Sequence, residues 1–232
     1  MAAMNTTNHH QGWRMPSPAH SGIYKLHLQA KESLGTAEVR DSVRLPRVID
    51  RTEGIAAKMV TLLEDLVYMV SAITDVCSES TCPKMCAGKH TSYSWADEKQ
   101  PAPRATSAPD YIRTLLMYAE DCLSDQTLVP SDGPPNSPAF LPMVRKLCKR
   151  FFRVYAHTYI HHFAEFQHFG GEAHLNCTFK HFLYFVIEFD LVDRVSMQPL
   201  SGLVKKFLEE DMSKAARASL DESGFVKPSM YS

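Results

Sequence analysis

Apolar residues recur at helical spacing in several long segments of this chain, and breaks rich in proline and glycine separate the segments. Residues 55–73 carry the clearest stripe, with apolar side chains at every third or fourth position over about five turns. Further stripes lie within residues 109–123, 139–167, 179–192 and 200–208. Few segments show the alternation that strands require. The pattern therefore predicts a mostly α-helical fold, a bundle of four or five long helices.

Two segments add detail to this prediction. Residues 179–192 are apolar on nearly every face of a helix, which predicts a helix buried at the centre of the bundle. Residues 91–95 alternate between polar and apolar side chains, which predicts a short strand or one arm of a β-hairpin.

The length of 232 residues and the hydrophobic content of 44% suit one domain with a sizeable core. Residues 1–22 are rich in Asn, His, Ser and Pro without an apolar run, so we predict a disordered amino-terminal tail. Residues 211–232 are polar and small, and they predict a flexible carboxy-terminal tail. The domain is then expected to span residues 23–210.

The formal net charge of −1 gives no global field that would draw the chain to nucleic acid or membrane, so any anion site must be local. The first residues do not read as a signal peptide, and no run of about 18 apolar residues predicts a membrane span. We therefore expect the protein in the cytoplasm or the nucleus. In these reducing compartments, the six cysteines should be thiols or metal ligands rather than disulfides.

Residues 148–163, CKRFFRVYAHTYIHHF, join a block of positive charge to a cluster of histidines. On a helical wheel, five basic residues fall within about 140° of arc, opposite an apolar face. They are Arg145, Lys146, Lys149, Arg150 and Arg153. No acidic residue lies between Asp132 and Glu165 to neutralise this basic face.

The basic face has two interpretations that the residues alone leave open. It could be a solvated surface, or an anion pocket in which two arginines and a lysine bind a phosphoryl group. Extended nucleic acid is a weaker candidate, because it usually needs a longer basic stripe than one helix face.

Four residues have the identity and spacing of zinc ligands. Cys77 and Cys82 follow the first long helix, and His157 and His162 follow the basic residues. Two cysteines and two histidines form a common closed tetrahedral set. A metal bound there would close a loop of about 80 residues and constrain the unfolded chain.

The choice of ligands stays open on spacing alone. Cys86 could replace either cysteine. His157 and His161 share one face of a regular helix, whereas pairing His157 with His162 requires a bulge or a helix end. Buried thiols with surface histidines are the alternative to a metal site. The crowding of six of the eleven histidines between residues 157 and 181 argues for the metal.

Six motifs make the chain resemble the Mob family of kinase adaptors, closest to the group that activates kinases of the NDR and LATS type. The resemblance extends over about residues 25–208. The motifs are ESLGTAEVRDSVRLP (32–46), CSESTCPKM (77–85), SYSWAD (92–97), SAPDYI (107–112), LCKRFFRVYAHTYIHHF (147–163) and EAHLNCTFKHFLYFVIEFDLVDR (172–194).

The resemblance implies a Mob-type fold with a four-helix-bundle core and one structural zinc ion. The zinc ligands of the family fall on Cys77, Cys82, His157 and His162, which leaves Cys86 and His161 outside the set. Its phosphopeptide pocket falls on Lys149, Arg150 and Arg153. Ser33 stands where the family carries a threonine that an upstream kinase phosphorylates.

The resemblance also implies an acidic surface for the kinase, before and along the first long helix. Asp50 and Glu53 match this surface. The chain departs from it at three positions, where relatives carry two acidic residues and a tryptophan: Ile49, Thr61 and Gly54. These departures weaken the acidic patch.

The function implied by the resemblance is that of a non-enzymatic adaptor in Hippo or mitotic-exit signalling. Such an adaptor binds an AGC kinase of the NDR or LATS type and a phosphorylated segment of a Ste20-type kinase or scaffold. A zinc hydrolase would need an open metal position, which a complete set of two cysteines and two histidines does not leave. A zinc-stabilised nucleic-acid-binding module is the alternative, and it would bind with a steep salt dependence.

Overall fold

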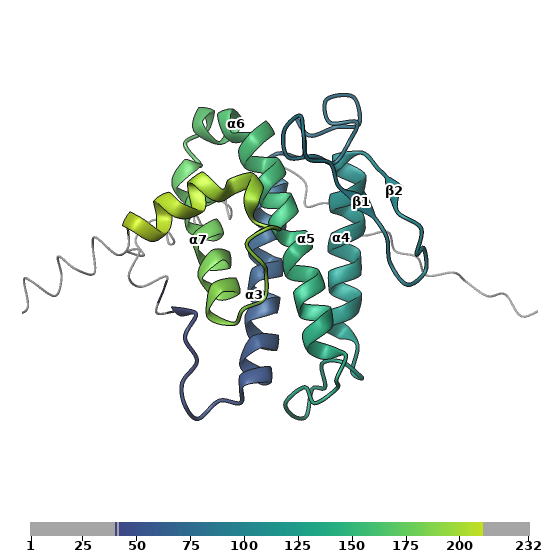
Figure 1. Cartoon of the computed structure of the whole chain (residues 1–232), viewed down its shortest axis with the longest axis vertical. Coiled ribbons are helices and arrows are strands. Elements are labelled where there is room, and N and C mark those ends of the chain that lie inside the picture. Colours follow the sequence, from purple (N-terminus) through teal and green to yellow (C-terminus); the bar gives the residue numbers. More distant parts are fainter. Residues whose placement is uncertain (1–39, 41, 211–232) are drawn as a thin grey trace, which may run out of the picture.

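Four long helices lie side by side in the computed structural model, which describes residue 40 and residues 42–210 (Figure 1). They are α3 (Arg51–Ser71), α4 (Ala108–Ser124), α5 (Phe140–His161) and α7 (Glu172–Glu188). α3 contacts both α4 and α7, and α4 contacts α5. The prediction of a mostly helical fold is confirmed. The predicted tails 1–22 and 211–232 lie outside the described residues, as does Ser33.

The interior of the bundle is rich in aromatic residues, many of which come from α5 and α7. Phe179, Phe182 and Phe185 of α7 are fully buried. The ring of Tyr155 on α5 lies 5.2 Å from the rings of both Phe179 and Phe182. The centrally buried helix expected near residues 179–192 is therefore present, although it begins earlier and ends at Glu188.

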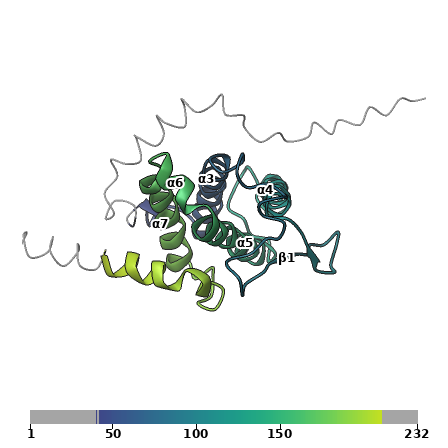
Figure 2. The ribbon, with the colours of Figure 1, turned by 90° about the horizontal axis from the view of Figure 1, so that it is seen from above.

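A further helical segment, residues 201–210, lies against α7 (Figure 2). A short 3₁₀ turn, η2 (Gln198–Leu200), leads into it. Its Phe207 lies 6.2 Å from Phe179, and Lys180 of α7 lies 3.6 Å from Glu210. This segment covers an apolar face of α7 that would otherwise meet water.

A small hairpin packs beside α4. β1 (Ser94–Trp95) pairs antiparallel with β2 (Arg104–Ala105), so the strand expected in residues 91–95 forms in its last two residues. Trp95 is buried, and its ring meets Tyr111 and Tyr118 of α4 edge-on at 5.3 and 5.7 Å. Such edge-to-face contacts anchor the hairpin to the bundle.

The single long helix expected over residues 139–167 is wrong in one respect, because the structure divides it at His162. α5 ends at His161, His162 has φ −130° and ψ 13°, and α6 (Phe163–His168) then begins. Apolar periodicity continues across the break, so it gave no sign of the interruption. The break turns the side chain of His162 toward the loop that follows α3.

Candidate metal centre and basic face

Cys77, Cys82, His157 and His162 come together at the end of α5. Sγ of Cys77 lies 3.6 Å from Nε2 of His157, and Sγ of Cys82 lies 3.4 Å from Nε2 of His162. All four side chains are buried, and their ligand atoms lie within 4.8 Å of one another. We call these four residues the closed cluster.

The geometry of the closed cluster suits a tetrahedral metal ion. Bond lengths of about 2.3 Å to sulfur and 2.0 Å to nitrogen place those two atoms about 3.5 Å apart on one zinc ion. Both sulfur–nitrogen distances in the cluster are close to this value. The donor set and its burial therefore fit a closed structural site better than an open catalytic one.

A hydrogen bond orients His157 for this role, and a carboxylate lies near the ring of His162. Nδ1 of His157 donates to the carbonyl oxygen of Cys86 at 2.8 Å, which leaves Nε2 unprotonated and directed at Cys77. A carboxylate oxygen of Glu165 lies 3.8 Å from Nδ1 of His162. Partners of this kind behind a ligating imidazole fix its tautomer and ring orientation.

The pKa values of His157 and Cys77 are shifted in ways that bear on metal binding. Burial lowers the pKa of His157 to about 4, so this imidazole is neutral near pH 7 and keeps its lone pair. Burial and the neighbouring Cys82 raise the pKa of Cys77 to about 12. The Cys77 thiol therefore stays protonated unless a positive charge stabilises its thiolate.

The break at His162 determines which cysteine and histidine side chains lie together at this end of α5. Because His162 leaves the helix, its ring reaches Cys82, while His161 remains on α5 and turns elsewhere. Cys86 does not replace either cysteine in the cluster. Instead its Sγ lies 3.3 Å from Nε2 of His161, a pairing that the sequence did not predict.

The basic face of α5 packs against aromatic rings. The guanidinium carbon of Arg150 lies 4.0 Å from the ring centre of Trp95 and 4.8 Å from that of Tyr118. Arg150 also donates to the carbonyl oxygen of Ala96, and only 6% of the residue is exposed. Arg150 therefore has a fixed position and does not behave as a solvated side chain.

Arg153 is held by two tyrosines. Its Nη1 donates to the hydroxyl oxygen of Tyr111 at 3.0 Å, and its guanidinium carbon lies 5.1 Å from the ring centre of Tyr93. The residue is half-buried. Nearby positive charge from Arg153 opposes the rise that burial causes in the pKa of Tyr111.

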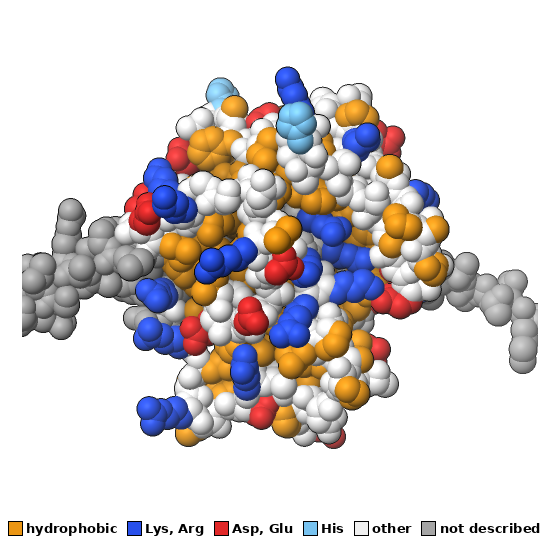
Figure 3. Space-filling model, viewed as in Figure 1, with side chains coloured by type: hydrophobic (Ala, Val, Ile, Leu, Met, Phe, Trp, Pro, Cys, Tyr) orange, Lys and Arg blue, Asp and Glu red, His pale blue; other side chains and the backbone are white. Residues whose placement is uncertain are grey.

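Acidic residues reach the basic face from distant parts of the chain. Asp193, after α7, lies 2.6 Å from Nζ of Lys149, and Glu98, after β1, lies 2.5 Å from Nζ of Lys146. Contact with Lys149 and with Ser196 lowers the pKa of Asp193 well below its usual range. Figure 3 shows basic side chains gathered over α5 with acidic ones among and beside them. Neither acid was predictable from the sequence of the helix, because both lie outside it.

A model of the family described as Mob1/phocein matches residues 31–200 of this sequence. The chain belongs to the Mob1/phocein family. The resemblance to Mob proteins that the motifs indicated is thus confirmed.

Curated Mob proteins match most of the chain. It is 38% identical over 183 residues to MOB kinase activator-like 1 homolog B of Dictyostelium discoideum. This alignment covers 78% of this chain and 85% of that protein. It is 36% identical over 186 residues to MOB kinase activator 3A of Mus musculus, covering 79% and 86%. It is also 36% identical over 195 residues to MOB kinase activator-like 1A of Arabidopsis thaliana, covering 83% and 90%.

In this Mob protein, the residues predicted to meet a kinase lie at the start of α3. Asp50 caps the helix, and its Oδ1 accepts from the amides of Thr52 and Glu53 at 2.8 and 3.3 Å. The Thr52 hydroxyl also donates to this carboxylate, and it makes the largest contribution to lowering the pKa of Asp50. The two amide bonds lower this pKa further. Glu53 is exposed on the first turn. Asp50 therefore has a structural task in addition to any role in binding.

Gly54, one of the departures from the expected family pattern, lies against a neighbouring side chain. A Cβ atom on Gly54 would lie 2.5 Å from both Cδ atoms of Leu45. Leu45, from the segment before α3, occupies the space that a larger residue at position 54 would need. Ile49 and Thr61, the other two departures, are exposed.

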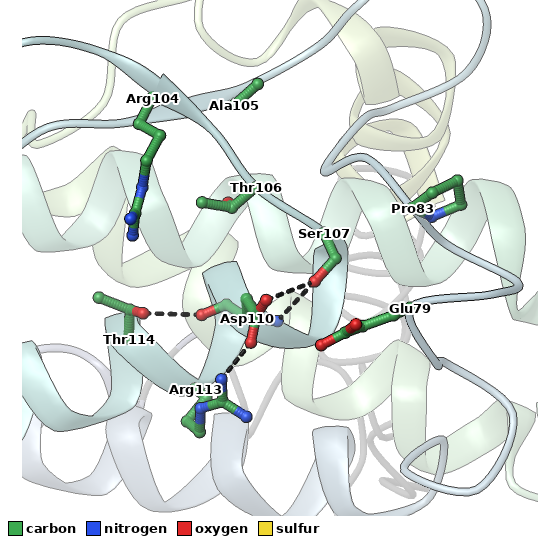
Figure 4. A pocket seen from close by; sticks show the side chains of 9 residues that line it. All are labelled: Glu79, Pro83, Arg104, Ala105, Thr106, Ser107, Asp110, Arg113 and Thr114. Atoms are coloured by element: carbon green, nitrogen blue, oxygen red, sulfur yellow. Dashed lines mark hydrogen bonds and ion pairs between the residues drawn. The ribbon is translucent and has the colours of Figure 1, made fainter.

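A polar pocket of about 560 Å³ lies over the amino end of α4 (Figure 4). Oγ of Ser107 donates to Asp110 at 2.9 Å, and Arg113 binds the other oxygen of that carboxylate. Glu79 and Arg104 also line the pocket. The hydrogen bonds between Ser107 and Asp110 in this pocket cap the amino end of α4. The described residues that line the pocket include none of the predicted site residues.

Proposed function

We propose that this Mob protein is a non-enzymatic kinase adaptor and activator that also binds a phosphorylated partner. The kinase would be an AGC kinase of the NDR or LATS type, and the second partner a phosphorylated segment of a Ste20-type kinase or scaffold. The names of the relatives, all MOB kinase activators, support the first part. The observation that carries the second is the group of cations on α5, in which aromatic rings hold Arg150 and Arg153.

Lys149, Arg150 and Arg153 would form the phosphate receptor. The tyrosines hold the guanidinium of Arg153, so binding a phosphate would cost little additional side-chain entropy. Lys149 is more exposed than Arg150, and its Nζ lies 2.6 Å from the exposed carboxylate of Asp193. Arg150 has little exposed surface and would act mainly as a positive charge behind the site.

A structural Zn²⁺ ion held by the closed cluster would keep this receptor in place. The ion would tie the loop after α3 to the junction of α5 and α6. Three cations close together on one helix repel one another, and a metal tie at the end of that helix would help to hold it against the repulsion.

The kinase would bind the exposed face of α3 and the turn before it. Asp50 and Glu53 would be the acidic residues of this surface. A basic segment of the kinase is the ligand that this charge favours. Ser33 remains a proposed phosphorylation site for an upstream kinase. The proposed location is the cytoplasm, with the nucleus as a second compartment. Within the described part of the chain, no helix is long and apolar enough to cross a membrane.

The alternative of a nucleic-acid-binding module has less support. Glu98 and Asp193 bind lysines on the basic face, and they would repel the phosphates of an extended strand. A single phosphoryl group needs far less basic surface than such a strand.

Calorimetry with a matched pair of phosphorylated and unphosphorylated peptides tests the receptor. We expect only the phosphorylated peptide to bind, and a nucleic-acid oligonucleotide to bind weakly. Equal affinity for both peptides would refute the receptor. Co-purification of a kinase with the chain tests the adaptor role separately.

A further inference from the structure

Cys86 and His161 form a second pair of metal-ligand side chains beside the closed cluster. Their Sγ and Nε2 atoms lie 3.3 Å apart, close to the separation of about 3.5 Å for two such ligands on one zinc ion. With His157, they offer three ligand atoms within 4.8 Å of one another. Unlike the closed cluster, this pair is open to solvent, because Cys86 is half-buried and His161 is exposed.

The turn at Gly88 fixes the tautomer of His161. The amide N–H of Gly88 lies 3.2 Å from Nε2 of His161, and an amide N–H can only donate. Nε2 is therefore the unprotonated nitrogen, so its lone pair points toward the turn that carries Cys86. Gly88 adopts a φ of 77°, which favours glycine. A metal at Nε2 would take the place of this amide.

The backbone holds the two side chains together. Ala87 donates to the carbonyl oxygen of Thr91 at 2.8 Å, and Cys86 forms a β-bridge with Ser92. These bonds close a tight loop whose base presents Cys86 to the last turn of α5. The pair is thus preorganised, which reduces the entropy cost of binding an ion.

His157 touches both groups but serves the closed cluster. Its Nε2 faces Cys77, and its Nδ1 is bonded to the Cys86 carbonyl oxygen. The rings of His157 and His161 lie 4.8 Å apart. Cys86 and His161 therefore remain as two donors that the closed cluster does not use.

We infer that Cys86 and His161 bind a second, solvent-accessible divalent cation of the thiophilic class, such as Zn²⁺ or Cd²⁺. Thiolate and imidazole are donors that suit these ions. Two side chains leave the remaining coordination positions to water or small anions, so the ion is held more weakly than in a closed set of four. The inference is independent of the kinase-adaptor role.

The test is a titration of the 232-residue protein with Cd²⁺ alone. The protein is first dialysed until one equivalent of Cd²⁺ remains bound, which we assign to the closed cluster. The binding of further Cd²⁺ is then followed by calorimetry and by the ultraviolet absorption of cadmium–thiolate bonds. We expect wild type to bind one additional equivalent with a new thiolate band. Cys86→Ser and His161→Gln should each lose that equivalent while keeping the first equivalent and the melting temperature. Cys122→Ser, which changes a half-buried cysteine beside Tyr118, should retain it.

The results separate the two sites. If wild type binds no second equivalent, or if both variants retain it, the inference is wrong. Loss of the first equivalent in Cys86→Ser would place Cys86 in the closed cluster and also overturn it. Retention of the first equivalent together with loss of the second in both variants would establish the exposed site.

Discussion

Arg153 has structural contacts at the position where we propose that a phosphate binds. Its guanidinium is bonded to Tyr111 and stacked on Tyr93, and it belongs to the proposed phosphate receptor. Loss of a hydrogen bond to a charged group typically costs about 1.5–3 kcal/mol. We expect Arg153→Ala to weaken a phosphopeptide by roughly tenfold to a hundredfold.

Arg153→Lys is the matched variant for this prediction. It keeps the charge but cannot form two parallel bonds to a phosphate, so it should recover little affinity. Calorimetry measures both variants, and circular dichroism checks that each remains folded. Full affinity in Arg153→Lys would mean that only charge matters at this position.

Asp193 is expected to oppose the receptor. Its carboxylate lies on Lys149, so a phosphate must displace it or share the lysine with it. Asp193→Asn should therefore strengthen phosphopeptide binding by a few-fold, a modest gain because exposed ion pairs are weak. The gain should shrink at high salt, which screens the same interaction. Weaker binding by this variant would show that Asp193 supports the receptor.

At the scale of elements, the start of α3 carries both a helix cap and the proposed kinase surface. Asp50→Asn keeps a side-chain oxygen for the cap but removes the charge, whereas Asp50→Ala removes both. We expect Asp50→Asn to melt like wild type and to bind a cognate kinase more slowly. Asp50→Ala should also lose a few degrees of melting temperature. Equal kinase binding by Asp50→Asn and wild type would exclude a role for this charge.

The Asp50 cap also predicts a pH dependence. Its pKa is lower in the folded state than the ordinary value of 3.8, because Thr52 and Glu53 donate to the carboxylate. The unfolded state then takes up the proton first as the pH falls. The contribution of the carboxylate is complete well above pH 3.8, decreases below it, and is lost once the pH passes the folded-state pKa. Acid titration of Asp50→Asn should lack this loss.

At the scale of the whole molecule, the closed cluster joins the loop after α3 to the end of α5. Metal-binding free energy at such a site is also folding free energy, so removal of a ligand should destabilise the entire domain. We expect about one tightly held zinc per chain, and a fall in melting temperature of roughly 10 °C or more for Cys82→Ala.

Elemental analysis and thermal melts, with and without a chelator, measure this effect. Cys122→Ser is the control, because Cys122 lies outside both Cys–His groups of the described residues. A Cys82→Ala variant that melts like wild type would show that the cluster does not stabilise the fold.

The sequence by itself determined that the chain is mostly helical, where most of the helices lie, and which residues are candidate metal ligands. Apolar periodicity is a local property, and a stripe such as that in residues 55–73 indicates a buried helix face wherever the helix lies. The basic face of α5 was predictable for the same reason. The identity of the four cluster residues rested on spacing and on the family motifs.

Only the tertiary structure decided which side chains meet across the chain. His162 faces Cys82 because α5 ends one residue earlier, and the pairing of Cys86 with His161 follows from the loop that Gly88 closes. Asp193 reaches Lys149 through the packing of the chain after α7 against α5. Such contacts join residues that no local pattern relates, since they depend on how the helices pack rather than on where each helix forms.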